Sequence, residues 1–347
     1  MNEHKENLKE HQQNRKLSAS ELGDLFTNYV GDTLYCCMFD HQLTVIKDKQ
    51  IKELLNKGLE ISQNHITKLE NLFNQESIPV PVGFGEQDLR SDAPRLFSDI
   101  FILFYFNQLT RANMTTFSDA IGTSTREDII EYFEACLDEN VQLYEKSLYM
   151  LLEKGVDTSP PTIPYPKKVD FIEKEGFTSF IKGKRRPLTA LEIKQLQINI
   201  NTNTLGKSLM LAFSQVASSE ALRQYFYEGV QLADKQISHL GQMLMKENLP
   251  TPKIMDTHIS DSTIAPFSDK LMLYHTFLAN GIGIQNYGLA ISKVLRHDIH
   301  SQFVTLSAGI AKYSNKGLNI MIENGWLEEP PTCADREKLS KDTKGTK

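Results

Sequence analysis

Residues 17 to 161 of this chain recur, with substitutions, as residues 188 to 331. Gly58 and Gly229 stand 171 positions apart inside helical patterns, and an offset of 171 holds for the first part of each copy before one position is lost and it becomes 170. Matched pairs include Leu17/Leu188, Pro79/Pro250, Pro81/Pro252, Asp99/Asp269 and Phe133/Phe303. A repeat this long with so few gaps is typical of two domains of one kind, and not of a solenoid of short units.

Composition and charge exclude several classes of protein. The chain has 347 residues, enough for two domains that each bury a core. A net charge of −6 gives no general attraction to nucleic acid or to anionic membranes. The longest apolar run, Ile100 to Phe106, is far shorter than the roughly 20 residues of a membrane span. The four cysteines form no CxxC pair, which argues against a zinc site and indicates a reducing cytoplasm.

Each copy reads as four long helices. Ser18 with Glu21 forms a capping box, and Thr189 with Glu192 repeats it. Apolar residues at helical spacing predict a second helix from about residue 48 to 75, and almost 20 residues follow before the third helix. By contrast, only Gly122-Thr123-Ser124 separates the third helix from the fourth. Because the order of short, long and short connections is that of a ferritin-like bundle, we predict an all-α protein of two tandem ferritin-like four-helix bundles, each with a long crossover.

The parts between the helices give the domain organisation. The segments Ile100–Phe106 and Leu271–His275 are apolar nearly all round, so we expect the third helices to form the contact between bundles or between subunits. The apolar linker residues Phe171, Ile172, Phe177, Phe180 and Ile181 predict that the linker packs along the bundles. The predicted units are a polar tail 1–16, a bundle 17–161, a linker 162–187, a bundle 188–331 and a polar tail 332–347.

Gly58 and Gly229 interrupt the apolar stripe of the second helix at the same place in both copies. A glycine inside a helix costs about 1 kcal/mol against alanine. Two at one position therefore indicate a close approach of a neighbouring helix, with a local bend as the alternative.

A ferritin-like bundle raises the question of a di-iron centre. Such a centre needs a Glu-x-x-His on two helices, and the chain contains neither this motif nor Asp-x-x-His. His65 follows Glu60 by five residues, which turns the two side chains about 140° apart. His65 also corresponds to Gln236, and His239 corresponds to Lys68, so neither histidine is repeated. We therefore predict no conventional di-iron site.

Three other histidines have alternative interpretations. His297 and His300 have the i, i+3 spacing of a shared metal site, but a solvated helix start is the simpler interpretation because no further ligand is marked. His275 lies in the apolar third-helix segment at the position of Tyr105. It is either a buried ligand or a core histidine with one hydrogen-bond partner, and we favour the second.

The repeated polar pairs fit a structural role better than catalysis. Arg126 and Asp128 recur as Arg296 and Asp298, where they could bind an anion or tie a helix start to its neighbour. Ser98 and Ser268 are typical helix-start residues. The basic run 182–186 could touch phosphates but is more typical of a solvated linker. No nucleophile-and-base motif or nucleotide fingerprint is present. We predict no catalytic, cofactor-binding or metal-binding residue and no cofactor.

These residues resemble the tandem ferritin-like family known as domain of unknown function 3231, which is found mainly in spore-forming bacilli and has members labelled as spore coat proteins. The resemblance covers residues 17 to 331. It rests on the Pro-x-Pro after each second helix, on the Phe-Ser-Asp at each third helix, and on the closings Gly155 to Pro161 and Gly325 to Pro331. The resemblance implies the fold and carries no catalytic residues with it.

The expected function is that of a non-catalytic structural or protein-interaction protein in the cytoplasm, with the spore or its coat as a further location. Protein partners or self-association are expected, and nucleic acid and a membrane span are not. The alternative is a bundle protein that binds a ligand or metal in one copy only, because His239, His275 and His297 occur in one copy each.

Overall fold

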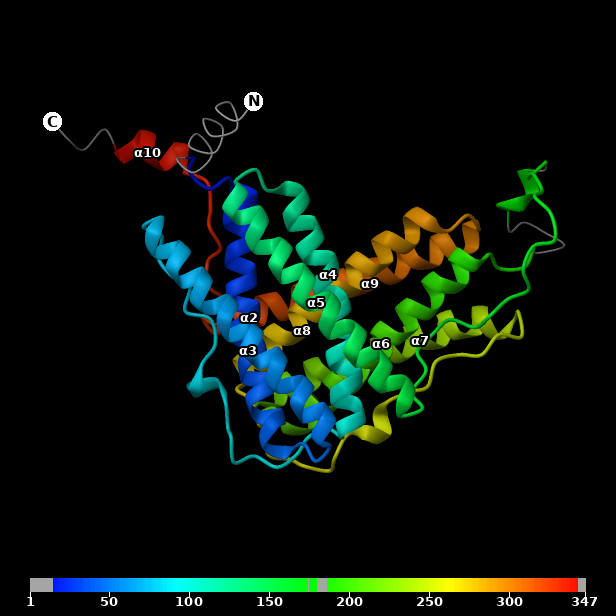
Figure 1. Cartoon of the computed structure of the whole chain (residues 1–347), viewed down its shortest axis with the longest axis horizontal. Helices are drawn as coiled ribbons and strands as arrows, with labels where there is room; N and C mark the ends of the chain where they lie inside the picture. Colours follow the sequence, from blue (N-terminus) through cyan, green and yellow to red (C-terminus); the bar gives the residue numbers. More distant parts are fainter. Residues whose placement is uncertain (1–14, 174, 180–185, 343–347) are drawn as a thin grey trace.

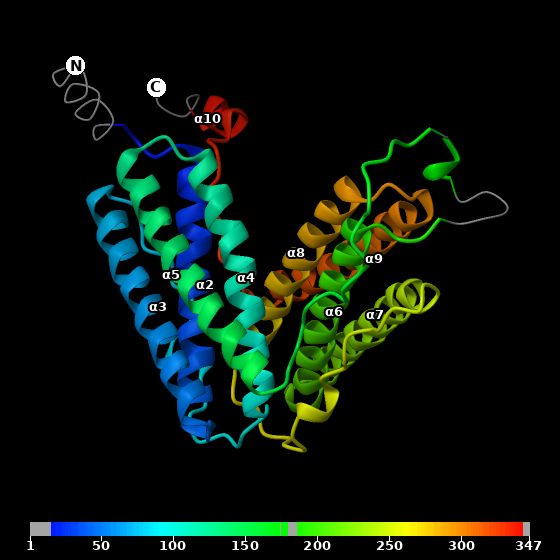
Figure 2. The same cartoon turned by 45° about the vertical axis from the view of Figure 1, so that its right-hand side comes forward.

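The chain forms two four-helix bundles that diverge from a common base (Figures 1 and 2). The computed structural model describes residues 15–173, 175–179 and 186–342. The first bundle consists of α2 (Ala19–Val45), α3 (Lys49–Gln75), α4 (Asp99–Thr123) and α5 (Glu127–Glu153). The second consists of α6 (Ala190–Val216), α7 (Glu220–Met245), α8 (Asp269–Lys293) and α9 (His297–Glu323). The turns η1 (Glu86–Asp88), η2 (Glu175–Phe177) and η3 (Asp256–His258) and the short helix α10 (Arg336–Asp342) complete the described elements. The predicted all-α class with two tandem bundles is confirmed, whereas the ferritin-like relationship stays a prediction.

The predicted capping boxes are present in both copies, and each does more than cap one helix. The Glu21 carboxylate accepts the backbone N–H of Ser18 at 2.7 Å, and the Ser18 hydroxyl accepts that of Glu21 at 3.3 Å. Glu21 also accepts the backbone N–H groups of Thr125 and Arg126 at 2.7 and 2.8 Å. The start of α2 is therefore joined to the start of α5. Glu192 makes the matching bonds in the second bundle.

The repeated arginine and aspartate also join helices. Arg126 donates to both carboxylate oxygens of Asp128, at 3.0 and 2.6 Å, and to Glu76 after the end of α3 at 2.5 Å. Arg296 repeats this with Asp298 and Glu247. The structural interpretation of the pair is confirmed, since the guanidinium ties the start of the fourth helix to the end of the second.

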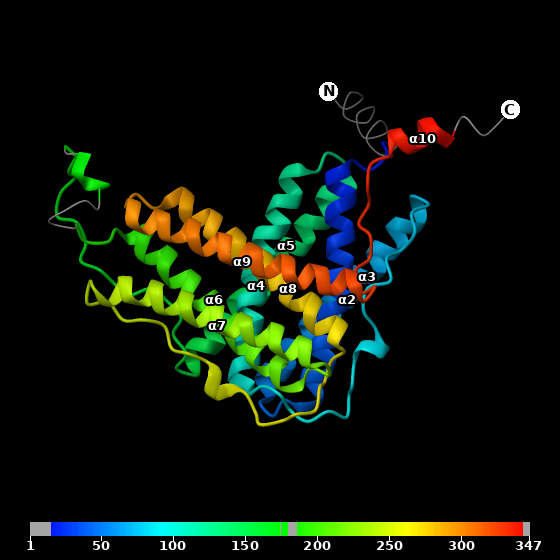
Figure 3. The same ribbon diagram turned by 180° about the vertical axis from the view of Figure 1, so that it is seen from behind.

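The long connections of the two bundles meet at the base and exchange hydrogen bonds (cyan and yellow in Figure 3). Ser98, which caps α4, donates its N–H to the carbonyl of His258 at 2.9 Å, and Ser268, which caps α8, donates to that of Asp88 at 2.9 Å. The side chains of the same residues are also paired. The Ser268 hydroxyl donates to the Asp88 carboxylate at 2.6 Å, and the Ser98 hydroxyl lies 2.8 Å from Nδ1 of His258. Positions 88 and 258, like 98 and 268, are equivalent in the repeat. One set of contacts is therefore made twice, as in a symmetric dimer.

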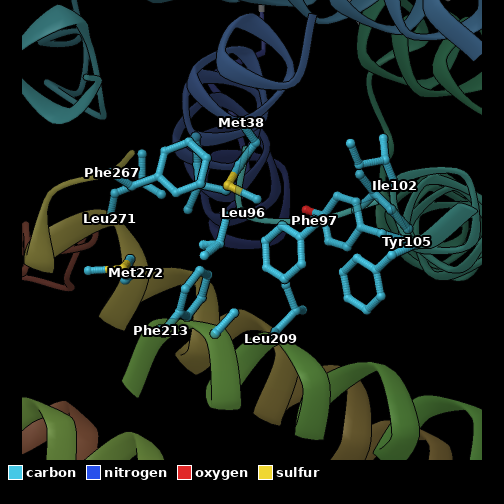
Figure 4. Packing of buried hydrophobic residues seen from close by; sticks show 14 of the residues in the cluster. Met38, Leu96, Phe97, Ile102, Tyr105, Leu209, Phe213, Phe267, Leu271 and Met272 are labelled. Carbon is cyan, nitrogen blue, oxygen red and sulfur yellow. The ribbon is translucent and has the colours of Figure 1, made fainter. Parts of the chain in front are cut away.

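A single apolar core crosses the seam between the bundles, as Figure 4 shows. The side chains that meet there come from α2, α4, α6, α8 and both crossovers, and include Met38, Leu96, Phe97, Tyr105, Leu209, Phe213, Phe267, Leu271 and Met272. The predicted contact through the third helices is confirmed. Burial of a Leu, Phe or Met side chain contributes roughly 1.5–3 kcal/mol, so this shared core holds the bundles together.

The two glycines on the second-helix stripe mark close packing and not a bend, because α3 and α7 run through them without a break. A Cβ atom on Gly58 would lie 2.7 Å from Cε2 of the Phe106 ring on α4. A Cβ atom on Gly229 would collide with Met210 on α6 and with the Tyr313 hydroxyl on α9. In both copies, a neighbouring side chain takes the space that only glycine leaves.

The linker differs from its prediction. Phe171 and Ile172 are 85% and 62% exposed, so the expectation that they pack along the bundles is wrong for this part of the linker. Residues 163–172 form no helix, and all of them are exposed. Phe177 is half-buried and lies 4.1 Å beneath the Arg186 guanidinium. Phe180, Ile181 and residues 182–185 of the basic run lie outside the described residues.

Arg186, the last residue of the basic run, is paired with a carboxylate, so the expectation of a solvated run is wrong for this residue. Its guanidinium donates to both carboxylate oxygens of the buried Glu192, at 2.7 and 2.8 Å. After α9, the chain returns to the first bundle (red in Figure 3), where Glu328 accepts the N–H groups of Val82 and Gly83 at 2.8 and 2.6 Å. The end of the linker is therefore tied to the second bundle, and the segment after α9 is tied to the first.

Candidate functional site

The centre of the first bundle contains a charged hydrogen-bond network. His65 on α3 lies between two carboxylates: its Nδ1 is 3.2 Å from Asp32 on α2, and its Nε2 is 2.8 Å from Glu139 on α5. Asp32 also accepts from the Ser62 hydroxyl at 2.8 Å and from the Asn28 amide at 2.5 Å. Asp32 and His65 are buried, whereas the side chain of Glu139 is one-third exposed. The network therefore runs from the bundle core toward the surface.

The electrostatics of this network favour the protonated form of His65. Burial alone would lower the pKa of His65, but hydrogen bonds with Asp32, Cys136 and Glu139 outweigh it and raise the pKa to about 12. The same contact with His65 lowers the pKa of Glu139. A protonated imidazole donates from both nitrogens and has no lone pair for a metal. Across the described residues, no group of three His, Cys, Asp or Glu side chains is arranged to hold a metal ion.

The second bundle has a neutral network at the same place. Asn203 stands where the first copy has Asp32, and Gln236 stands where it has His65. The Tyr287 hydroxyl on α8 joins them, since it accepts from Asn203 at 2.8 Å and donates to Gln236 at 3.1 Å. Gly309 replaces Glu139. The second centre has thus lost both carboxylates and the cation between them.

The two centres enclose cavities of unequal size at equivalent positions. The cavity of the first bundle measures about 20 Å³ and that of the second about 90 Å³. Four lining positions lose most volume in the second copy, where Gly206, Thr276, Ala279 and Gly283 stand for Tyr35, Phe106, Leu109 and Asn113. This loss exceeds the gain from Ile310 in place of Asn140 and Tyr313 in place of Leu143. Because a well-packed interior has few voids larger than a water molecule, these substitutions account for the larger space.

The comparisons with known proteins agree with the duplication. The family described as "Protein of unknown function (DUF3231)" matches the chain twice, over residues 5–169 and 177–339. The chain belongs to this family. No curated protein matches it. Among solved structures, a "putative spore coat protein" from Bacillus halodurans C-125 is 23% identical, with a TM-score of 0.39. The match covers 46% of this chain and 99% of that one.

The histidines singled out in this DUF3231 protein do not form a common site. His275 is buried at the seam and its Nε2 lies 2.8 Å from the Tyr105 hydroxyl, which confirms a core histidine with one partner. His239 is exposed on α7. His297 is exposed at the start of α9, and His300 is half-buried one turn later, as a solvated helix start predicts. Among the residues that the structure describes, no helix is long and apolar enough to cross a membrane.

Sequence reasoning missed Asp32 and Glu139 as partners of His65. One signal was available, since Asp32 is a carboxylate between Gly31 and Thr33 on an inward-facing part of α2, and the second copy replaces it with Asn203. The linked change of His65 to Gln236 and Glu139 to Gly309 also marks the three as a set. The four cysteines are all free, and Cys136 lies against His65. The prediction that the chain has no catalytic, cofactor-binding or metal-binding residue stays a prediction.

Proposed function

We propose that this DUF3231 protein is a non-catalytic structural protein that binds other proteins, and that it works in the spore or its coat. The proposed location is the cytoplasm, and the spore or its coat is a further location that comes from the family resemblance. The two bundles supply a rigid body with a shared core, and the linker supplies the contact with partners. We expect the linker to bind either a different protein or a second copy of this chain.

The observation that carries the proposal is the exposed apolar segment of the linker. Tyr165, Val169 and Phe171 are 94%, 87% and 85% exposed, and Ile172 is 62% exposed. Several large apolar side chains in one short segment are unusual on a protein surface and are typical of an interaction site. Tyrosine is also enriched among the residues that dominate binding energies at protein interfaces.

The test replaces the three most exposed apolar linker residues, Tyr165, Val169 and Phe171, by serine. Native and variant chains are produced in a sporulating bacillus, and the share of each in the extracted spore coat is measured. We expect the native protein in the coat extract and an about tenfold lower share of the variant, which corresponds to about 1.4 kcal/mol of binding. A chain with Val304→Ser and Ile322→Ser, which alters exposed residues of α9, is the matched control and should behave as the native chain.

A second function is favoured by a different observation: the second bundle binds a small ligand and the first does not. The cavity of about 90 Å³ in the second bundle supports this, since the equivalent space of about 20 Å³ in the first holds on the order of one water molecule. Elemental analysis and native mass spectrometry of the purified protein test it. A bound metal would favour the metal version of this function, and a bound organic molecule the ligand version.

A further inference from the structure

The larger cavity lies where the second bundle meets α4 of the first. Helices α6, α7, α8 and α9 supply most of its lining, including Leu209, Leu232 and Ile310, and α4 adds Tyr105 and Arg111. Most of the surface of this lining is therefore apolar. The shape suits a small apolar molecule, because pockets for such ligands are apolar with few polar groups.

One buried polar pair in the lining has an unmet hydrogen bond. The His275 ring is 5% exposed, and its Nδ1 has no hydrogen-bond partner among the described residues. Its Nε2 shares one hydrogen bond with the Tyr105 hydroxyl. If Tyr105 donates, the neutral ring keeps its proton on Nδ1; if the ring donates, the Tyr105 hydroxyl keeps a free proton. In either arrangement one donor at the cavity lacks an acceptor, which costs about 1–3 kcal/mol when buried.

Arg111 adds a positive charge that no carboxylate in the described chain balances. Within the described residues, its guanidinium makes one long hydrogen bond, of 3.4 Å from Nη2 to the Thr202 hydroxyl. Arg111 is half-buried, and this partial burial lowers the pKa of Arg111. Arginine remains charged even so. An arginine in this setting has unused donors in a planar fork, which is the geometry that carboxylates fit.

The second copy has also lost the acids that would repel an anion. The first bundle holds Asp32 and Glu139 at its centre, and the second has Asn203 and Gly309 at these positions. The second copy therefore differs from the first in two ways at this place: its central residues are neutral, and its lining side chains have less volume. Space from the second bundle, a free donor and the unpaired Arg111 cation of the first bundle therefore occur together at one place on the seam.

We propose that this cavity binds a small organic acid, with its apolar body among the α6–α9 side chains and its carboxylate on Arg111 and the free donor of the Tyr105–His275 pair. The inference rests on the second function proposed above, ligand binding by one bundle. It adds the chemical class of the ligand and places the anion-binding residues on the first bundle as well as the second. Both bundles are then needed for binding.

The test is calorimetric titration of the full chain with three probes. Hexanoate has an apolar body and a carboxylate, hexan-1-ol has only the body, and acetate has only the charge. We expect saturable 1:1 binding of hexanoate, and affinities at least about tenfold lower for the other two. Arg111→Met should lower hexanoate affinity about tenfold or more, whereas Arg111→Lys should retain part of it because the charge remains.

Filling the cavity provides an independent arm. Gly206→Tyr with Ala279→Leu gives the second copy the residues of the first and should abolish hexanoate binding while circular dichroism shows native helix content. If this variant does not fold, the comparison of Arg111→Met with Arg111→Lys still tests the proposal. Equal binding of hexanoate and hexan-1-ol, or unchanged affinity in Arg111→Met, would overturn the ligand class and leave ligand binding by the second bundle in place. Binding of neither probe would overturn both.

Discussion

Tyr105 and His275 occupy equivalent positions of the two repeats and contact each other, with 2.8 Å between the Tyr105 hydroxyl and Nε2 of His275. A residue that meets its own counterpart must lie near the axis that relates the two copies. The two rings are buried in the core that crosses the seam. The chain therefore has the construction of a symmetric dimer in a single polypeptide, and the duplication allowed the two axis positions to become different residues.

Tyr105→Phe removes the hydroxyl from this pair. We expect a loss of about 1–3 kcal/mol in the free energy of unfolding, because both nitrogens of buried His275 are then without a partner. Urea denaturation followed by circular dichroism measures it. Tyr149→Phe is the control, since Tyr149 is 57% exposed and should change stability by less than about 0.5 kcal/mol. Equal effects of the two substitutions would contradict the pairing.

The pH dependence of stability should contain a contribution from His275. Burial lowers the pKa of His275 to about 4, so between about pH 6.5 and 4 the unfolded chain takes up a proton that the folded chain does not. Stability from this group is complete above pH 6.5 and is lost as the pH falls, by up to about 1.4 kcal/mol per unit. His275→Gln should remove this share of the slope. Parallel stability curves for the native and variant chains between pH 6.5 and 4 would show that the ring titrates normally.

The charged network of the first bundle predicts a non-additive pair of substitutions. His65→Gln leaves Asp32 as an uncompensated buried charge, and we expect a loss of about 3–5 kcal/mol near pH 6. Adding Asp32→Asn recreates the neutral residues of the second copy and should restore a large part of that loss. Denaturant unfolding of the single and double variants measures the coupling. A double variant that is less stable than His65→Gln alone would argue against the charge explanation.

His65 also gives a pH dependence of the opposite sign. Hydrogen bonds with Asp32, Cys136 and Glu139 outweigh the effect of burial and raise the pKa of His65 to about 12. Its contribution is therefore complete below about pH 6.5 and is lost as the pH rises above that value. The stability difference between the native chain and the Asp32→Asn, His65→Gln variant should shrink from pH 6.5 to 9. A difference that stays constant over this range would mean that His65 is uncharged in the fold.

The packing glycines predict a strong contrast between two similar substitutions. Gly58→Ala places a methyl group against the Phe106 ring and should cost about 1–3 kcal/mol through overpacking. Gly281→Ala meets nothing within 4 Å on an exposed turn of α8 and should stabilise the chain by up to about 1 kcal/mol. Thermal unfolding of the two variants provides the comparison, and a stabilising Gly58→Ala would refute the close approach.

Sequence alone determined the helices, their caps and their repetition, because these depend on local spacing and on hydrogen bonds within a few residues. The capping box at Ser18 and the bonds of Arg126 to Asp128, two residues further on, are of this kind. Only the tertiary structure decided which distant side chains meet and which stay in water. Asp32, His65 and Glu139 meet from three helices, whereas the apolar Phe171 is exposed. The tertiary structure also showed that four replacements by smaller residues, Gly206 and Gly283 among them, line one cavity. These positions are scattered along the sequence and come together only when the helices pack.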